Sequence, residues 1–529
     1  MFNPRTSPAL EPIEKSQVSF SGGQRDRDHP SLLKPDEYSR GINIEIRESG
    51  LGATRRGFQT KTDQVGVNFQ GGIFFDPSGG SPMIVQVNGG QIWTWGGTGT
   101  TWTRVGVTQL NNTTDRVAIV VLNFVLYIFS GPDDNGKSWD GIAADFTDMG
   151  NGNTNAPRGN IACIQSGRIC LSGVESTATI VDARSHIFYS DIFDGSTWNR
   201  STNNKRVPTD GDEPVTALAT YRKEEHLAFT RNTTHKFDIS GATVTNFSRE
   251  TLDPHIGCVA PDSVVVVGED CFFVSADKQV RTIKRTIQDI AYGVSVPITY
   301  ENPNLFNRIK SSAVNKCAGV FFDNYYLLAG PLDSNIVNSS VMPFDTLHQK
   351  QGTAGVVPIC LGEWAAFAAG GWVITNFSGI PQLYFLNSTT GAAALALEAT
   401  TDDGIEIPLT VDLRAELFDY PDHDKTMHSV SIQLLDTFGN FDLNYAKDGD
   451  STFTAFYVDK VISDPSSLNF PIPAFPFDFP AGGVLFEIKA RFYRRGRSKY
   501  WQIQIHHTDG PINIKYITMR AFVESMSTR

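Results

Sequence analysis

The chain is poor in helical signals, and this limits its class. No long stretch of the 529 residues repeats apolar side chains at helical spacing, so a mainly helical fold is excluded. Charged residues make up 19% and hydrophobic residues 40%, a balance that also excludes a disordered chain. Methionine is scarce (7), whereas glycine (47) and phenylalanine (35) are abundant. Many tight turns between half-buried strands are typical of such a composition.

Long hydrophobic runs and a secretory leader are also lacking. The longest apolar stretch extends only from Val117 to Phe129 and contains Asn123. It is too short for a transmembrane helix and fits two paired strands. Residues 1–15 contain no apolar core of a signal peptide. We therefore expect no stable membrane insertion and assembly in a reducing cytoplasm.

The motifs of common enzymes and metal sites are absent. The 6 cysteines form no Cys-x-x-Cys pair, and free buried thiols are favoured because a long chain builds its core without cross-links. Cys163 and Cys170 nevertheless occupy the two arms of one predicted hairpin. GxSxG, Walker and HExxH motifs do not occur, and the cluster at 422–424 is interpreted as a turn. The sequence predicts no enzyme, no cofactor and no metal.

The charge balance argues against tight binding of nucleic acid. The net charge is −12, whereas a protein that grips nucleic acid needs a basic footprint. An acidic surface repels the phosphate backbone, so it remains compatible with a wall past which DNA slides.

A repeated β-hairpin fills the middle of the chain. An apolar strand, a tight polar turn and an aromatic-rich strand recur about every 48 residues, a period typical of a β-propeller. We count seven hairpins, and six blades with a closing strand pair remain an alternative. The second strands are at 91–95, 124–129, 168–172, 226–230, 271–275, 325–329 and 382–386.

Three regions follow from this pattern. Residues 1–68 are rich in proline and mixed charge and predict an extended arm that docks on a neighbour, with a short strand at Ile42–Ile46. Residues 69–400 hold the predicted propeller. Residues 401–529 contain six longer alternating segments, typical of a β-sandwich. The predicted class is therefore all-β.

Two segments of the last region are candidate contact surfaces. The insertion at 463–483 is rich in proline and phenylalanine, and it either folds back on its own domain or forms a tip for subunit contact or channel lining. A basic run near 489–499 is either a solvated turn or a subunit contact, and we favour the contact. The candidate residues are Phe470, Phe475, Phe477, Phe479, Arg494, Arg495 and Arg497.

A carbohydrate-binding or glycoside-hydrolysing propeller is the alternative function. Segments 130–139 and 190–198 approach the Asp-box pattern Ser-x-Asp-x-Gly-x-x-Trp of sialoside-cleaving propellers. In both segments the spacing is stretched, and the sequence offers no assignable arginine triad with a tyrosine nucleophile. A generic protein-interaction propeller is a third reading.

The order of several motifs resembles a known family. The segment GGQRDRDHPSLLKPDEYSRGINIEIRESGLGATRRGFQ at 22–59 resembles the opening of phage tail nozzle proteins, also called DNA-stabilisation or tail tubular proteins. In that family a glycine-rich start is followed by Leu-Leu-x-Pro-x-Glu, an asparagine in a strand and Arg-Arg-Gly. Segments 188–199, 322–331, 401–407 and 494–505 are similar to the family as well.

The resemblance implies a structural protein of the virion tail, assembled in the host cytoplasm. It implies a homo-hexamer around the tail axis, below a portal–adaptor ring, that retains packaged double-stranded DNA and forms the conduit for its ejection. Tail fibre or spike proteins are further expected neighbours. Arg25, Arg27, Arg55 and Arg56 are the candidate adaptor-docking residues.

Overall fold

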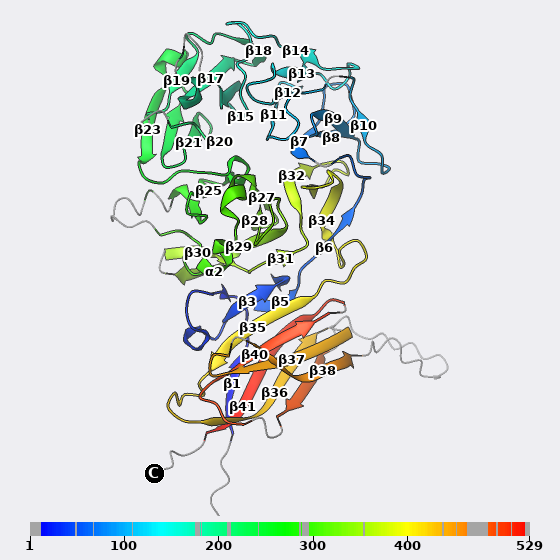
Figure 1. Cartoon of the computed structure of the whole chain (residues 1–529), viewed down its shortest axis with the longest axis vertical. Coiled ribbons are helices and arrows are strands. Elements are labelled where there is room, and N and C mark those ends of the chain that lie inside the picture. The colour runs from blue at the N-terminus through cyan, green and yellow to red at the C-terminus, as the bar shows by residue number, and fades with distance from the viewer. Residues whose placement is uncertain are drawn as a thin grey trace, which may run out of the picture.

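A computed structural model shows that the chain is all-β, as predicted (Figure 1). Among the described residues, α-helix is limited to α2, Pro303–Asn307, and to Ile283, Lys284 and Ile287, and none of it has the length and apolar character of a membrane span. The structure describes residues 12–47, 50–66, 68–107, 109–174, 180, 182–208, 213–241, 243–284, 287, 296–352, 355–435, 439–450, 452–462, 485–492, 496–508 and 510–523.

Seven small antiparallel sheets account for most of the strands. Each consists mainly of consecutive hairpin-linked strands, as the repeat predicts. In chain order of their first strands they are β7 (Phe69–Phe75), β8 (Met83–Asn88), β9 (Gln91–Trp95) and β10 (Thr103–Arg104); β11 (Ala118–Leu122), β12 (Val125–Phe129), β13 (Lys137–Trp139) and β14 (Thr147–Asp148); β15 (Ile161–Gln165), β16 (Arg168–Ser172), β17 (His186–Asp191), β18 (Asp194–Trp198) and β19 (Asn204–Arg206); β20 (Ala217–Arg222), β21 (Glu225–Phe229), β22 (Thr234–Asp238) and β23 (Ser248–Asp253); β24 (Val265–Val267), β25 (Asp270–Val274) and β26 (Val280–Thr282); β27 (Ala318–Phe322), β28 (Tyr325–Gly330), β29 (Ser340–Gly352), β30 (Gly355–Cys360) and β31 (Trp364–Ala365); and β32 (Ala369–Thr375), β33 (Gln382–Asn387), β34 (Ala393–Ala399) and β6 (Gly57–Thr60).

These sheets close into a ring. The first strands of successive sheets contact one another in the order β7, β11, β15, β20, β24, β27 and β32, and β32 contacts β7 again. The last sheet takes its outer strand from the other end of the chain, because β6 pairs with β34, with Leu395 opposite Gln59. We call this β6–β34 pairing the seam, and the seven sheets the ring.

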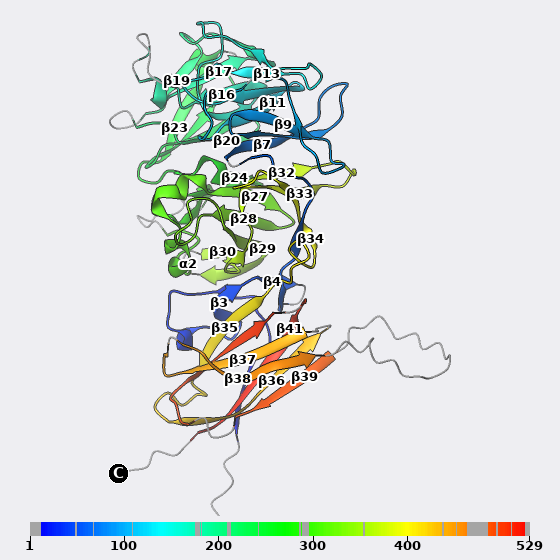
Figure 2. The same cartoon turned by 45° about the vertical axis from the view of Figure 1, so that its right-hand side comes forward.

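Two six-stranded sheets lie next to the ring, below it in Figures 1 and 2. We call them the two-sheet unit. One contains β1 (Ile13–Gln17), β4 (Ile44–Arg47), β5 (Leu51–Thr54), β36 (Lys425–Leu435), β39 (Leu485–Arg491) and β41 (Asn513–Val523). The other contains β2 (Gly23–Gln24), β3 (Glu37–Ile42), β35 (Leu409–Glu416), β37 (Gly439–Lys447), β38 (Thr454–Ile462) and β40 (Trp501–His507).

The described part of the predicted arm is not separate from these two bodies. β1 pairs along β41, β3 pairs with β35, and β5 pairs with β41, so the N-terminal strands complete both sheets of the two-sheet unit. The predicted boundary at residue 68 is therefore corrected for residues 12–60, which belong to the two-sheet unit and, through β6, to the ring. The physical reason is that these short strands bury their backbone groups only by pairing with distant strands.

A shared core joins the two bodies. In β40 the side chains of Trp501, Ile503 and Ile505 are fully buried, as their alternation predicts. Their cluster also includes Trp364 and Phe385, which come from the last two sheets of the ring. The hydrophobic core thus continues from the two-sheet unit into the ring. All 6 cysteines are free and buried, as expected.

A buried histidine inside the ring makes stability sensitive to acid. His226 is fully buried, stacks on Phe237 and has Nε2 3.0 Å from the hydroxyl of Tyr189. Burial lowers the pKa of His226 to about 4. The unfolded chain protonates near its ordinary pKa of 6.5, so the stability present above pH 6.5 is lost as the pH falls toward 4.

We expect this histidine to contribute up to about 3 kcal/mol of acid destabilisation. Thermal unfolding measured between pH 7.5 and 4 should show the loss, and His226→Gln should make the same curve shallower. An unchanged pH profile in the variant would contradict the assignment.

Candidate functional site: the joint between the ring and the two-sheet unit

Residues of the N-terminal motif segment that resembles the family meet where this segment passes from the two-sheet unit to the ring. This joint is formed by β3, β4, β5 and β6 with the ends of the sixth and seventh sheets of the ring. Gly57 begins β6, and a Cβ atom on it would lie 2.1 Å from the carbonyl oxygen of Thr401. Only glycine fits there, which gives the glycine of Arg-Arg-Gly a physical reason.

Arg55 is the centre of the joint. Its side chain is fully buried and forms a bidentate ion pair with Asp402, with Nη1–Oδ1 at 2.9 Å and Nη2–Oδ2 at 2.6 Å. Nε donates to Oδ1 of Asn43 at 2.9 Å, and Nη2 donates to the carbonyl oxygen of Ala365 at 2.8 Å. The guanidinium also lies 4.5 Å from the ring centroid of Phe367. Because the guanidinium is saturated inside the molecule, Arg55 is not exposed for adaptor docking, contrary to the prediction.

Asn43, which accepts the Nε–H of Arg55, also forms hydrogen bonds to two other segments of the joint. Its backbone is left-handed, with φ of 57°, a conformation that asparagine tolerates better than most residues. Nδ2 donates to the carbonyl oxygen of Pro408, and Oδ1 also accepts the backbone N–H of Ala365, both at 2.8 Å. The asparagine of the family pattern therefore connects the two-sheet unit to the sixth sheet of the ring.

Arg56 bridges the joint at its edge. It pairs with Glu45 of β4 at 3.0 Å and with Asp323, in the turn between β27 and β28, at 2.9 Å. This pairing borders an open hollow of about 900 Å³. Asp345 on the ring side of the hollow accepts the backbone N–H groups of Leu347 and His348 and holds the His348 imidazole at 2.7 Å. These bonds fix the bulge where β29 shifts register against β30.

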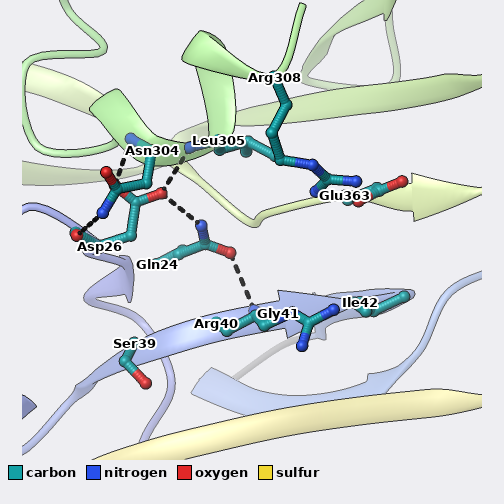
Figure 3. A pocket seen from close by; sticks show the side chains of 10 residues that line it. All are labelled: Gln24, Asp26, Ser39, Arg40, Gly41, Ile42, Asn304, Leu305, Arg308 and Glu363. Atoms are coloured by element: carbon teal, nitrogen blue, oxygen red, sulfur yellow. Dashed lines mark hydrogen bonds and ion pairs between the residues drawn. The ribbon is translucent and has the colours of Figure 1, made fainter. Parts of the chain in front are cut away.

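Asp26 caps helix α2 of the ring from the N-terminal segment (Figure 3). Its carboxylate accepts the backbone N–H groups of Asn304 at 3.0 Å and Leu305 at 2.9 Å, and it also accepts Gln24 Nε2 at 3.1 Å. Oε1 of Gln24 in turn accepts the N–H of Gly41 at 2.9 Å. Burial raises the pKa of Asp26, and the hydrogen bonds from Asn304 and Leu305 only partly oppose this. The network surrounds a cavity of about 160 Å³ beside Arg40 and Arg308.

Replacing Asp26 by alanine is expected to lower the free energy of unfolding by about 1–2 kcal/mol, because two helix N–H groups lose their acceptor. Chemical denaturation measures this change. Asp36→Ala is the matched control, because Asp36 lies in the same segment and its backbone carbonyl accepts the N–H of Gly22, a bond that the substitution keeps. Equal losses in both variants would contradict the capping role.

The remaining candidate docking cations are also used within the chain. Arg25 forms ion pairs with Asp28 and, at 3.6 Å, with Glu37, the buried glutamate of Leu-Leu-x-Pro-x-Glu. Arg27 stacks over the ring of Tyr300 at 3.6 Å. Phe470, Phe475, Phe477, Phe479, Arg494 and Arg495 lie outside the described residues. Arg497 is exposed, next to the bridge between Ser498 and Lys425.

The segment 190–198, which approaches an Asp-box, has a structural role in the ring. Asp194 accepts the backbone N–H groups of Ser196 at 2.8 Å and Thr197 at 3.3 Å, and the indole of Trp198 donates to the carbonyl oxygen of Gly195 at 2.8 Å. These bonds all lie within β18, Asp194–Trp198, and order this strand. In the part of the chain that the structure describes, no group of three or more His, Cys, Asp or Glu residues could hold a metal ion.

Comparisons with known proteins identify no family for this chain. No protein family model and no curated protein matches the sequence. Similar solved structures include a chain of the mitotic checkpoint complex (8% identity, TM-score 0.38, covering 67% of this chain and 96% of that one). YCF48 bound to D1 peptide has 10% identity and a TM-score of 0.34, covering 67% and 97%. An ancestral GH74 enzyme has 10% identity and a TM-score of 0.38, covering 69% and 51%.

Proposed function

We propose that the seven sheets are the blades of a seven-bladed β-propeller, that the two-sheet unit is a β-sandwich, and that the chain is a tail nozzle protein of a short-tailed phage. In this role it is a structural part of the virion. Copies surround the tail axis as a homo-hexamer, retain the packaged DNA below the portal–adaptor ring and form the conduit for its ejection.

The observation that supports this proposal is the role of the motif residues in the structure. Glu37, Asn43, Arg55 and Gly57 belong to successive motifs of the family pattern, and all four are buried in the N-terminal segment at the joint. A joint of this kind transmits load between two rigid bodies, because separating them breaks many bonds at once. That property suits a wall that confines DNA under pressure.

The acidic charge supports the conduit role as well. With a net charge of −12, the protein repels the phosphate backbone on average, so DNA can move past it without sticking. Subunit contacts would then be made by other surfaces, and the exposed Arg497 together with the segments at 463–483 and 494–495 remains the proposed contact region.

Electron microscopy of the purified protein and of phage particles tests this function. We expect a six-fold ring on the tail axis, with the chain detected in virions by mass spectrometry. A monodisperse monomer that is absent from particles would overturn the proposal. Binding or cleavage in a glycan-array and glycosidase screen would instead favour the carbohydrate alternative.

A further inference from the structure

One ion pair joins two sheets of the ring that are not neighbours. Arg116 directly precedes Val117 and β11, at the start of the second sheet, and Asp262 lies in the short 3-10 turn Pro261–Ser263 before β24, at the start of the fifth. Between them the ring order places β15 and β20 on one side and β27, β32 and β7 on the other. Arg116 and Asp262 therefore belong to sheets on opposite sides of the ring.

The contact is bidentate. Nε of Arg116 donates to Oδ1 of Asp262 at 2.9 Å and to Oδ2 at 2.8 Å, and Nη2 lies 2.6 Å from Oδ1. Planar pairing of this kind is the strongest geometry for an arginine and a carboxylate. The side chains remain 26% and 43% exposed, so water reaches the pair but does not surround it.

Both ends of the pair are fixed by neighbouring sheets. Nη1 of Arg116 donates to the carbonyl oxygen of Asn160, which directly precedes β15. The 3-10 turn that carries Asp262 is held by Ser263, whose Oγ donates to the carbonyl of Ala260 and whose own carbonyl accepts the hydroxyl of Tyr326 at 2.9 Å. These contacts restrict both side chains before they pair, so less conformational entropy is lost on pairing.

Most surface ion pairs contribute little to stability, and this one differs in its topology. The first strands contact one another in ring order, and the second and fifth sheets are not neighbours in that order, so a bond between them must cross the centre of the ring. Because Arg116 and Asp262 both precede the first strands of their sheets, they lie at the same end of the ring's centre, which we call the mouth. We infer that Arg116 and Asp262 form a strut that closes this mouth and couples opposite sides of the ring.

The strut has a consequence for the path of DNA, which rests on the proposed function. A centre that one arginine and one aspartate can span is far too narrow for a duplex. DNA would therefore pass along the outside of the ring, between copies.

A double-mutant cycle in the full-length chain tests the strut. Arg116→Met and Asp262→Asn should each raise the ratio of unfolded to folded protein about tenfold, and the double variant should raise it about tenfold rather than about a hundredfold. The matched control is Lys137–Asp148, a pair at 2.6 Å that joins two strands of one sheet. Its cycle should show coupling of no more than about fivefold.

Native-state hydrogen exchange distinguishes a strut from an ordinary ion pair. In either single variant, amides of both β11 and β24 should exchange faster together, and about 1 M salt should produce the same change in the unmodified chain. Additive effects in the cycle, or faster exchange confined to the substituted sheet, would overturn the inference. Neither measurement needs a particle, so failure of the strut leaves the nozzle proposal standing, and failure of the nozzle proposal leaves the strut.

Discussion

Deletion of residues 1–60 is expected to abolish cooperative unfolding of the remaining chain. The deletion removes β6 and opens the seam, leaving β34 with an unpaired edge. It also removes β1, β2, β3, β4 and β5, so that both sheets of the two-sheet unit lose strands. The fully buried side chains Phe20, Tyr38 and Ile44 leave the shared core with them, and each such loss costs about 2–5 kcal/mol.

Calorimetry and circular dichroism of the 61–529 chain measure this effect. A chain that lacks only residues 1–11 is the control, because that deletion leaves every described strand pairing in place. If the 61–529 chain unfolds in one transition at the temperature of the full chain, the N-terminal segment is not part of either body.

Substitution of Arg55 by methionine is expected to lower the free energy of unfolding by about 3–5 kcal/mol. The variant leaves the Asp402 carboxylate in a nearly water-free site without its cation, and the penalty for such an uncompensated charge exceeds the loss of the pair itself. Oδ1 of Asn43 and the carbonyl of Ala365 lose a donor as well. Arg55→Lys should recover little, because a single ammonium cannot reproduce the planar, bidentate geometry.

Equilibrium denaturation compares this variant with Arg520→Met. Arg520 also forms an ion pair at 2.7 Å, with Glu14, but both side chains are exposed, at 37% and 48%. A loss of at most about 1 kcal/mol is expected there. Similar losses in the two variants would show that burial of Arg55 adds nothing and would contradict its central role in the joint.

Local patterns explain why the ring was predictable. Each hairpin carries its own alternation and its own turn residues, so the seven repeats predict strands that the structure confirms at β9, β12, β16, β21, β25, β28 and β33. The same reasoning would have found β37, where Phe441, Leu443 and Tyr445 alternate with polar residues. This strand is not among the six segments predicted for the last region.

The joint could not be predicted in the same way. β6 has only four residues, and its partner lies more than three hundred positions away, so nothing local marks it as the strand that closes the ring. Arg55 and Arg56 look like any exposed cations in the sequence, and Asp402 looks like a turn residue. The fold brings Nη2 of Arg55 within 2.6 Å of Oδ2 of Asp402. Because this pair is buried, Arg55 forms an internal ion pair and is not a docking residue.

Hydrogen exchange of the intact chain, followed at the amides of β6, tests the closure of the ring most directly. If the segment at 57–60 closes the last sheet, its amides that pair with β34 should exchange as slowly as those of β33 in the middle of that sheet. Exchange of β6 at the rate of an unpaired peptide, with β33 and β34 still protected, would contradict the seam.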